Sequence, residues 1–572
     1  MRPIYKIMFS SPANSNMRAV PALVLFFITL FTIVSFGQSK SVLLNFSSEL
    51  QKEPITGRMF IFISTSNATE LRTQRNPGCV IFATDVSALK PGEEAEITEK
   101  TLGYPLVSLN NFPAGDYYIQ GLLNVYTEFH RADGHTIWAH MDQWEGQKYN
   151  VSPGNFYSEV QKIHLDPAKD NKIKITLTKK IPPIKVPEDT KWVKRVKIKS
   201  EILTKFWGHP FYIGATLLLP KGYDEHPDVY YPVEYEQTHF TLGIPHGLVD
   251  HPTPETPEEK ARRIRNYDET GYEFFQQWTS ETFPRMICVT FQHPTPYYDD
   301  SYAVNSANNG PYGDAIMQEL IPYLEEHFRM IREPYARVIK GGSTGGWETL
   351  ALQVYHPDFF GSSWTYYPDP IDFRCYGLIN IYEDENAFYT GGGWAKIERP
   401  MNRAPNGLPT NTFKLQTQLE EVLGSKGRSG EQLDIWEAVY GPTDEEGYPK
   451  PLWDRKTGVI DHSVANYMKE HNYDLRYYME TNWSELGPKL AGKMHFLCGD
   501  MDGFYLNLGV YKMEEFLEKT TNPYYGGTFQ YGRPLKGHGW TPYNNYQAVK
   551  VEADYVQKKA EELGKTIKWN YK

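Results

Sequence analysis

One short stretch, Arg337 to Trp347 with the sequence RVIKGGSTGGW, limits most strongly what this chain can fold into. A short apolar run of strand type leads into Gly-x-Ser-x-Gly, and the residues from Thr349 to Tyr355 are apolar at helical spacing. Glycines flank Ser343 at positions where side chains would collide with a sharp turn. The stretch therefore predicts a strand, a strained turn that lifts the Ser343 hydroxyl above a sheet, and a helix.

The chemistry of such a turn depends on what surrounds the serine. The start of a helix offers free N–H groups, among them that of Thr344, and the positive end of the helix dipole. Both features suit the stabilisation of an oxyanion. We therefore interpret Ser343 as a nucleophile; the alternative is an ordinary glycine-rich turn.

A serine nucleophile needs a histidine base and a carboxylate that orients it. Met494 to Cys498 reads as a late strand, followed by the turn Gly-Asp-Met-Asp-Gly that holds Asp500 and Asp502. His538 is the one histidine after that turn, and glycines bracket it. Asp502 and His538 are therefore the predicted acid and base. Asp500 stays open as the acid, with capping of the next helix as its other role.

A second oxyanion donor is expected from the loop after the third strand of the sheet. That loop runs from Tyr235 to Phe240, so the backbone N–H of His239 or Phe240 is predicted to act together with that of Thr344. Aromatic residues suited to a sugar or phenolic ring are predicted at Trp347, Trp364 and Trp394. The alternative for most of them is a place in the core.

The pattern of the chain changes twice along its length. Residues 38–180 hold short runs of strand type separated by turn residues, which predicts an antiparallel β-sandwich. A proline-rich linker follows at 181–190. In residues 191–572 strands alternate with helices, which predicts a mostly parallel sheet, with an antiparallel start and helices on both faces. Residues 383–488 interrupt the alternation and are interpreted as an insertion, either a lid over the site or a unit packed far from it.

The N-terminus carries an apolar run from Val20 to Val34 after Arg18. The run is shorter than the roughly 20 residues that a bilayer span needs, which favours a signal peptide over residues 1–37. An uncleaved anchor is the alternative. We therefore expect a secreted or periplasmic protein with no stable membrane insertion after cleavage.

Composition limits the partners and cofactors. The formal charge is −11 with no basic block, which argues against nucleic acid and anionic membrane surfaces. The four cysteines have neither disulfide nor metal spacing. The predicted chemistry needs no metal and no cofactor.

At these residues the chain resembles the esterase D-like family of α/β-hydrolases, which includes feruloyl, acetyl xylan and enterochelin esterases. The similar parts are RVIKGGSTGGW with HPDFFG after it, GDMD after the late strand, and GHGW near the end. The resemblance implies an α/β-hydrolase fold and ester cleavage by Ser343, Asp502 and His538. One departure is that Thr238 precedes His239, where such proteins show a His-Gly or Gly-His pair.

The sequence thus predicts an exported serine esterase acting on small-molecule or polysaccharide esters, with acyl or feruloyl groups as candidates. Two alternatives stay open. A peptidase of the prolyl oligopeptidase type shares the elbow, but its propeller needs more residues than the N-terminal region supplies. A non-catalytic carbohydrate-binding protein on a hydrolase scaffold is the other.

Overall fold

A computed structural model describes residues 40–571, except 75–77, 141–147, 167–168, 170, 266–267 and 393. The predicted signal segment, 1–37, lies outside the described residues. Within the described ranges, no helix has the length and apolar character needed to cross a bilayer.

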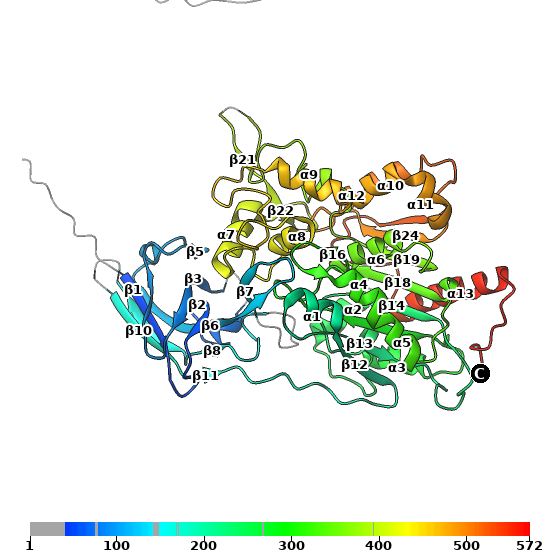
Figure 1. Cartoon of the computed structure of the whole chain (residues 1–572), viewed down its shortest axis with the longest axis horizontal. Coiled ribbons are helices and arrows are strands. Elements are labelled where there is room, and N and C mark those ends of the chain that lie inside the picture. The colour runs from blue at the N-terminus through cyan, green and yellow to red at the C-terminus, as the bar shows by residue number, and fades with distance from the viewer. Residues whose placement is uncertain are drawn as a thin grey trace, which may run out of the picture. The chain divides into compact units, whose positions relative to one another are not determined.

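The centre of the fold is an eight-stranded sheet that carries the elbow strand near its middle (Figure 1). The first three strands in sheet order pair antiparallel and the remaining neighbours pair in parallel, so the sheet is mixed. In sheet order the strands are β12 (Val193–Ser200), β13 (Phe211–Leu218), β15 (Ile287–Gln292), β14 (Val233–Gln237), β18 (Arg337–Gly342), β19 (Ser362–Tyr366), β24 (Met494–Gly499) and β25 (Thr528–Gly532).

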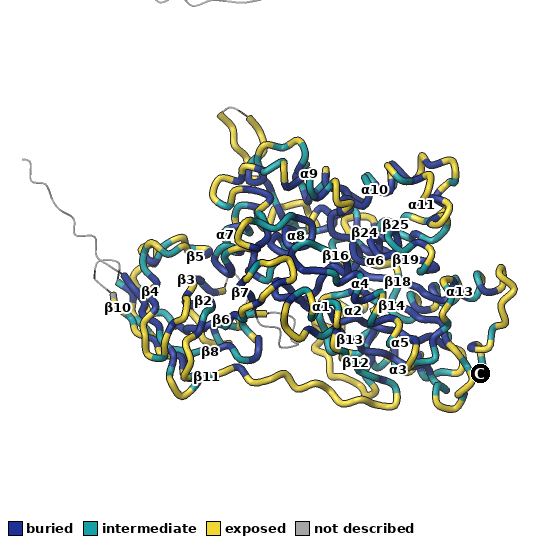
Figure 2. Tube along the Cα trace, viewed as in Figure 1, coloured by how far each residue is buried: buried dark blue, intermediate teal, exposed yellow. Residues whose placement is uncertain are grey.

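Neighbouring residues of a strand point to opposite faces of the sheet, and in this sheet apolar side chains cover both faces. Leu217 and Val289 belong to a large core that includes residues of helix α6 (Thr344–Tyr355). Their neighbours Leu218 and Cys288 pack instead with α3 (Gly271–Trp278) and α13 (Asn545–Glu562). The trace of β18 and α6 is buried throughout most of its length (Figure 2), so the elbow is held from both sides.

Further helices precede the elbow and follow the late strand. They are α1 (Glu201–Trp207), α2 (Pro257–Arg265), α4 (Tyr312–Ala315), α5 (Ile321–His327) and α12 (Asn507–Leu517). A π-helical segment, Ile316–Leu320, joins α4 to α5. Two short strands, β16 (Asn305–Ser306) and β17 (Gly310–Pro311), pair just before α4.

The N-terminal strands form two sheets around one apolar core. The smaller sheet has the order β10 (Asn171–Leu177), β1 (Lys40–Phe46), β4 (Ala95–Thr98). Leu44 and Ile175 from it share a core with Ile61 and Leu123 of the larger sheet. β1 pairs with β10 in parallel, so the predicted wholly antiparallel arrangement is wrong at this pair. The larger sheet contains β2 (Ile55–Ser64), β3 (Val80–Leu89), β5 (Gly103–Tyr104), β6 (Gly115–His130), β7 (Thr136–His140), β8 (Phe156–Tyr157), β9 (Gln161–Leu165) and β11 (Lys179–Lys180).

The predicted insertion contributes helices and two small hairpins. Its helices are α7 (Phe413–Leu423), α8 (Gln432–Tyr440), α9 (His462–Glu470), α10 (Leu475–Thr481) and α11 (Trp483–Leu490). Its strands are β20 (Tyr389–Thr390), β21 (Ile397–Glu398), β22 (Pro400–Arg403) and β23 (Pro409–Thr412). In this region the sequence predicts helices from Phe413 to Leu423 and from His462 to Met479. The first agrees with α7, the second is divided into α9 and α10, and α8 is not predicted.

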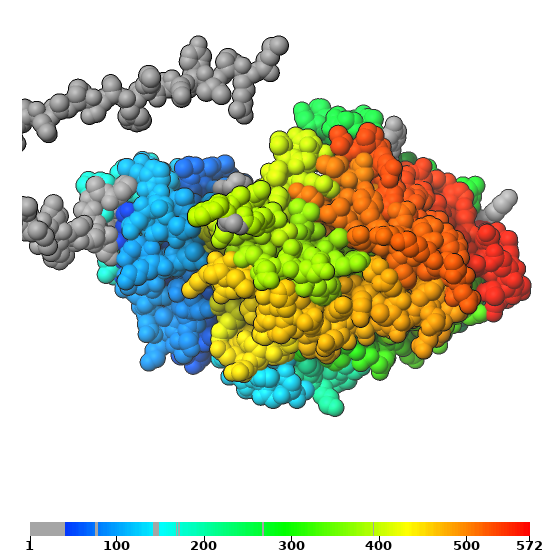
Figure 3. Space-filling view, turned by 90° about the horizontal axis from the view of Figure 1, so that it is seen from above, coloured from blue at the N-terminus to red at the C-terminus, as the bar shows by residue number. Residues whose placement is uncertain are grey.

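Helix α7 connects the insertion to the N-terminal sheets. Arg58 donates to the backbone oxygens of Glu421 and Val422, and Gln418 donates to that of Gly103. The space-filling view shows the yellow surface that includes this helix against the blue N-terminal strands (Figure 3). The N-terminal strands therefore brace the insertion.

Candidate active site

The elbow has the strained geometry that its glycines suggest. Ser343 has φ 60° and ψ −121°, at the junction of β18 and α6. A Cβ on Gly345 would lie 2.0 Å from the Gln237 oxygen, and one on Gly341 2.3 Å from the Gly345 oxygen. The glycines thus let β14, β18 and α6 approach closely, which forces the serine out at the tip of the turn.

His538 lies against Asp502. Its Nδ1 is 2.8 Å from Oδ2 of the buried carboxylate. The other carboxylate oxygen accepts from the backbone N–H of Phe504 at 2.8 Å and of Leu506 at 3.3 Å. Because both oxygens are engaged, the carboxylate has a fixed orientation toward the imidazole. The rings of Tyr367 and Phe504 flank that imidazole, each with centroids 4.8 Å away.

Asp500 has a different partner. Its Oδ1 accepts from the backbone N–H of Lys536 at 2.9 Å. It therefore fastens the start of the loop that carries His538 and caps no helix. The contact with the imidazole belongs to Asp502.

A side chain of the insertion supports the Asp502 turn. Arg403, at the end of β22, donates through Nε to the Asp502 backbone oxygen at 2.9 Å and through Nη2 to Asn507 Oδ1 at 2.9 Å. Its guanidinium also lies 4.3 Å from the Tyr505 ring. The insertion thus helps to position this part of the site.

Asp369, which the sequence reading missed, lies directly beside Ser343. The Ser343 hydroxyl is 3.4 Å from Asp369 Oδ1, and the Asp369 backbone N–H donates to the Ser343 oxygen at 3.0 Å. Burial raises the pKa of the Asp369 carboxyl, although hydrogen bonds from Tyr302 and Trp436 oppose the shift. The one available signal is its place just beyond the carboxyl end of β19, the edge where open α/β sheets bind ligands.

Four side chains donate hydrogen bonds to the Asp369 carboxyl group. Tyr302 donates to Oδ2 at 2.6 Å and Thr344 at 3.1 Å. From α8, Gln432 donates at 3.0 Å and Trp436 at 3.2 Å. The insertion therefore packs beside Ser343 through α8, so the interpretation as a unit packed far from the elbow is wrong.

The predicted oxyanion loop lies against the elbow, because β14 ends at Gln237, whose oxygen faces Gly345. The His239 side chain turns toward two carboxylates: Nδ1 is 3.0 Å from Asp299 Oδ1 and 3.1 Å from Asp300 Oδ2. Burial alone would lower the pKa of His239, but these carboxylates raise it to about 11. Phe240 follows in the same loop.

The predicted aromatic contacts are wrong for Trp347 and Trp364, which are buried, whereas that of Trp394 stays a prediction. Trp347 is fully buried and packs with Tyr302 and Tyr440. Trp364 is buried against His495. Trp394 is fully exposed. Two of these rings belong to the core and the third is exposed. An aromatic residue in a sequence does not reveal whether its ring faces the core or the solvent, so the sequence could not separate these cases.

A cavity of about 500 Å³ lies beside the predicted oxyanion loop. His239, Tyr298 and Asp299 line it from the loops after β14 and β15, and Tyr149 and Glu431 line it from the N-terminal part and the insertion. Tyr298 also donates to Gln432 at 3.2 Å, which places one wall of the cavity next to the Asp369 network.

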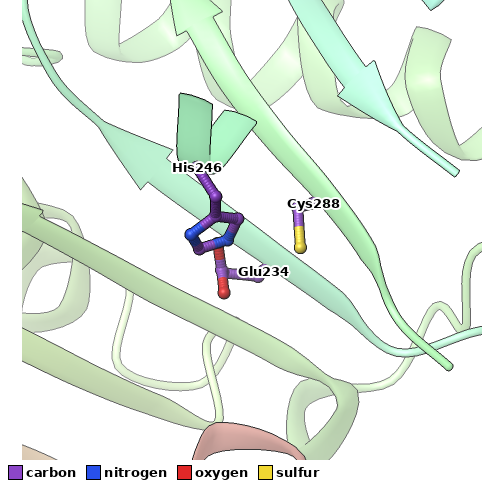
Figure 4. A group of neighbouring side chains, drawn as sticks. All are labelled: Glu234, His246 and Cys288. Atoms are coloured by element: carbon purple, nitrogen blue, oxygen red, sulfur yellow. The ribbon is translucent and has the colours of Figure 1, made fainter. Parts of the chain in front are cut away.

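Two groups among the described residues have donor atoms close enough to hold a metal ion. One is His239 with Asp299 and Asp300. The other is Glu234, His246 and Cys288, drawn in Figure 4, in which Glu234 and Cys288 are register partners on β14 and β15. His246 belongs to a short 3₁₀ turn, Pro245–Gly247, and its Nε2 lies 2.8 Å from Glu234 Oε1.

Comparison with known protein families finds a match for the segment that contains the elbow. Residues 267–399, which include the elbow, match the family model described as a putative esterase. This match confirms the resemblance for that segment. The chain matches no curated protein.

Three solved structures are similar over about two thirds of this chain. A ferulic acid esterase is 16% identical, with 64% of this chain and 98% of that chain covered and a TM-score of 0.34. An S-formylglutathione hydrolase from Agrobacterium tumefaciens is 12% identical, with 66% and 99% covered and a TM-score of 0.32. A ferulic acid esterase from the anaerobic fungus Anaeromyces mucronatus is 13% identical, with 65% and 91% covered and a TM-score of 0.26.

Proposed function

We propose that the protein is a serine esterase in which Ser343, His538 and Asp502 form the catalytic triad. The observation that carries the proposal is the 2.8 Å contact between His538 Nδ1 and the buried Asp502 carboxylate, in a chain whose elbow serine holds φ 60°. The putative-esterase match over 267–399 supports ester cleavage as the reaction.

The proposed mechanism is acyl transfer to Ser343. Asp502 holds Nδ1–H of His538, which leaves Nε2 to take the serine proton as Oγ attacks the ester carbonyl. The same nitrogen then donates that proton to the leaving alcohol. Water attacks the acyl-enzyme through a second tetrahedral intermediate and releases the acid. The Asp502 charge stabilises the imidazolium that forms in each step.

The proposed oxyanion hole consists of the backbone N–H groups of Thr344 and of His239 or Phe240. The contact between the Gln237 oxygen and Gly345 supports this choice, because it holds the loop beside the N-terminus of α6. The positive end of that helix lies where the oxyanion charge would develop.

The proposed substrate is a carboxylic ester on a sugar or polysaccharide, acyl or feruloyl in kind. The cavity beside the oxyanion loop supports a ring-bearing group, because Tyr149 and Tyr298 line it among polar side chains. In the proposed organisation, an exported α/β-hydrolase domain (191–572) follows a β-sandwich domain (38–180) and a linker (181–190). The protein is proposed to be secreted or periplasmic, after removal of residues 1–37.

The test compares the protein with Ser343→Ala on p-nitrophenyl acetate, a feruloyl ester and acetylated xylan. We expect hydrolysis that disappears in the variant, together with covalent labelling of Ser343 by a fluorophosphonate probe. Labelling with cleavage of peptide amides would favour the peptidase. The absence of both labelling and turnover would favour the non-catalytic carbohydrate-binding protein.

A further inference from the structure

A compact cluster of anionic side chains borders the oxyanion loop. Asp299 and Asp300 are buried, and both present a carboxylate oxygen to Nδ1 of His239, at 3.0 and 3.1 Å. The donor atoms of all three residues lie within 4.8 Å of one another. The His239 side chain is 45% exposed, so the cluster can be reached from the cavity that His239 and Asp299 line.

A third carboxyl group, that of Glu348 on α6, lies behind this cluster. Glu348 is fully buried, and neither of its carboxylate oxygens has a hydrogen-bond partner among the described residues. Asp300 is a charged neighbour of this carboxyl group. Two neighbouring buried carboxylates repel each other unless a cation, either a proton or a metal ion, neutralises the pair.

Positive charge near the cluster is scarce. Lys148 reaches Asp299 Oδ2 only at 3.6 Å and is 61% exposed, so water screens it. Glu431 lines the same cavity and adds a further carboxyl group. His239, when protonated, is therefore the one close cation among the described residues for three buried carboxyl groups.

The second candidate metal-binding group, Glu234 with His246 and Cys288, differs because a buried cation already lies beside it. The Lys340 ammonium lies 3.1 Å from Glu234 Oε1 and 4.0 Å from Glu552, so that group already holds a buried cation (Figure 4 shows the three donor side chains). A metal ion would have to displace the lysine from a site whose side chains are almost fully buried.

We propose that His239, Asp299 and Asp300 bind one divalent cation of the zinc or manganese type, with Glu348 supplying charge behind Asp300. One imidazole with carboxylates suits these ions, whereas an all-oxygen set would suit calcium or magnesium. Ligands about 2.1 Å from an ion stand roughly 3.0 to 3.4 Å from each other, which matches the observed spacings of 3.0 and 3.1 Å. The ion takes the place of the proton on Nδ1.

The cation would fix the loop that contains His239. Because the backbone N–H of His239 or Phe240 is the proposed second oxyanion donor, removal of the ion is expected to lower turnover. This consequence rests on the proposed function, whereas the binding itself does not.

The binding experiment uses the full-length protein, purified without a histidine tag and stripped with a chelator that is then removed. Zn²⁺, Mn²⁺, Mg²⁺ and Ca²⁺ are titrated separately by calorimetry. We expect one equivalent of Zn²⁺ or Mn²⁺ to bind. His239→Ala and Asp299→Asn are each expected to weaken that binding at least 10-fold, since even outer partners of metal ligands contribute about 10- to 100-fold.

His251→Ala is the matched control, because His251 also pairs with an aspartate, Asp250 at 2.8 Å, but at an exposed position. It should bind the ion as the unaltered protein does. Glu348→Gln keeps the shape and removes the charge, so it should weaken binding while the melting temperature of the stripped protein shows that it still folds.

Each outcome decides the matter. Lack of saturable binding, tighter binding of Mg²⁺ or Ca²⁺, or equal affinities in His239→Ala and His251→Ala would overturn the site. If one ion binds but neither the stripped nor the loaded protein hydrolyses an ester, the metal site would be supported and the proposed esterase function would be wrong. Turnover that is the same in stripped and loaded protein would overturn the coupling to the oxyanion loop.

Discussion

The phenol of Tyr302 donates a 2.6 Å hydrogen bond to Asp369, the carboxyl group that lies beside the Ser343 hydroxyl. The same phenol oxygen accepts from Trp436 at 2.7 Å and from Gln432. One buried oxygen thus joins the loop before α4, the turn after β19 and the insertion helix α8. The stability of this region and the position of Ser343 are therefore expected to depend on it.

Tyr302→Phe tests that dependence. The change removes the hydrogen bond to the Asp369 carboxyl group and takes one of two acceptors from both Gln432 and Trp436, so we expect the free energy of unfolding to fall by about 2 to 3 kcal/mol. Tyr440→Phe is the matched control: its ring packs on Tyr302, and its hydroxyl has no hydrogen-bond partner among the described residues. Urea unfolding should show little loss for the control, and equal losses in both variants would contradict the argument.

Asp502→Asn tests the choice of acid. The variant keeps the shape but favours the wrong imidazole tautomer, which in a serine protease lowers kcat by about 10⁴. We expect a loss of roughly 10³- to 10⁴-fold here on p-nitrophenyl acetate, with KM almost unchanged. Asp500→Asn keeps an oxygen for the Lys536 N–H and should retain kcat within about 10-fold. A larger loss in Asp500→Asn would reverse the assignment.

The sequence predicts those parts of the site whose signal lies within a few consecutive residues. The elbow needs glycines on both sides of Ser343, and the turns that carry Asp502 and His538 follow a strand or lie between glycines. The Asp369 network could not be found in this way, because its partners Tyr302, Thr344 and Trp436 come from segments far apart in the sequence.

Helix α8 shows a second limit of the sequence. All nine residues from Gln432 to Tyr440 are buried or half-buried, and the polar residues Asp434 and Glu437 are as buried as the apolar ones, so the helix presents no solvent face of the usual amphipathic kind. The boundary between β12 and α1 is set by a cap. Strand β12 ends at Ser200, whose hydroxyl accepts from the Leu203 N–H and starts α1. That capping signal is local and could have been recognised.

Arg403→Ala tests whether the insertion positions the acid. Loss of both hydrogen bonds frees the Asp502 turn, and a displacement of about 1 Å at a catalytic group can reduce the rate by about 10²-fold. We expect kcat to fall about 10-fold or more while KM changes little, because Arg403 contacts the turn and does not line the cavity beside His239. Arg403→Lys should recover only part of the rate, since a lysine cannot serve both acceptors in the same geometry. A rise in KM at constant kcat would place Arg403 in substrate binding instead.

His293 is expected to make the fold sensitive to acid. It is buried, and its Nδ1 accepts from the backbone N–H of Ser301 at 3.1 Å. Burial lowers the pKa of His293 to about 4, below the usual value of about 6.5. Between those values the unfolded chain takes up a proton that the folded chain refuses, so the free energy of unfolding falls as the pH falls, by roughly 3 kcal/mol in all.

His293→Asn removes the titration and keeps an oxygen where Nδ1 accepts the Ser301 N–H. We therefore expect the variant to lose less stability than the unaltered protein when urea unfolding is compared at about pH 7.5 and about pH 4.5. His251→Asn, at an exposed position away from the Ser301 contact, should lose as much as the unaltered protein. The same pH dependence in all three proteins would mean that the Ser301 contact does not keep His293 neutral, and the acid sensitivity would have to come from the carboxyl groups.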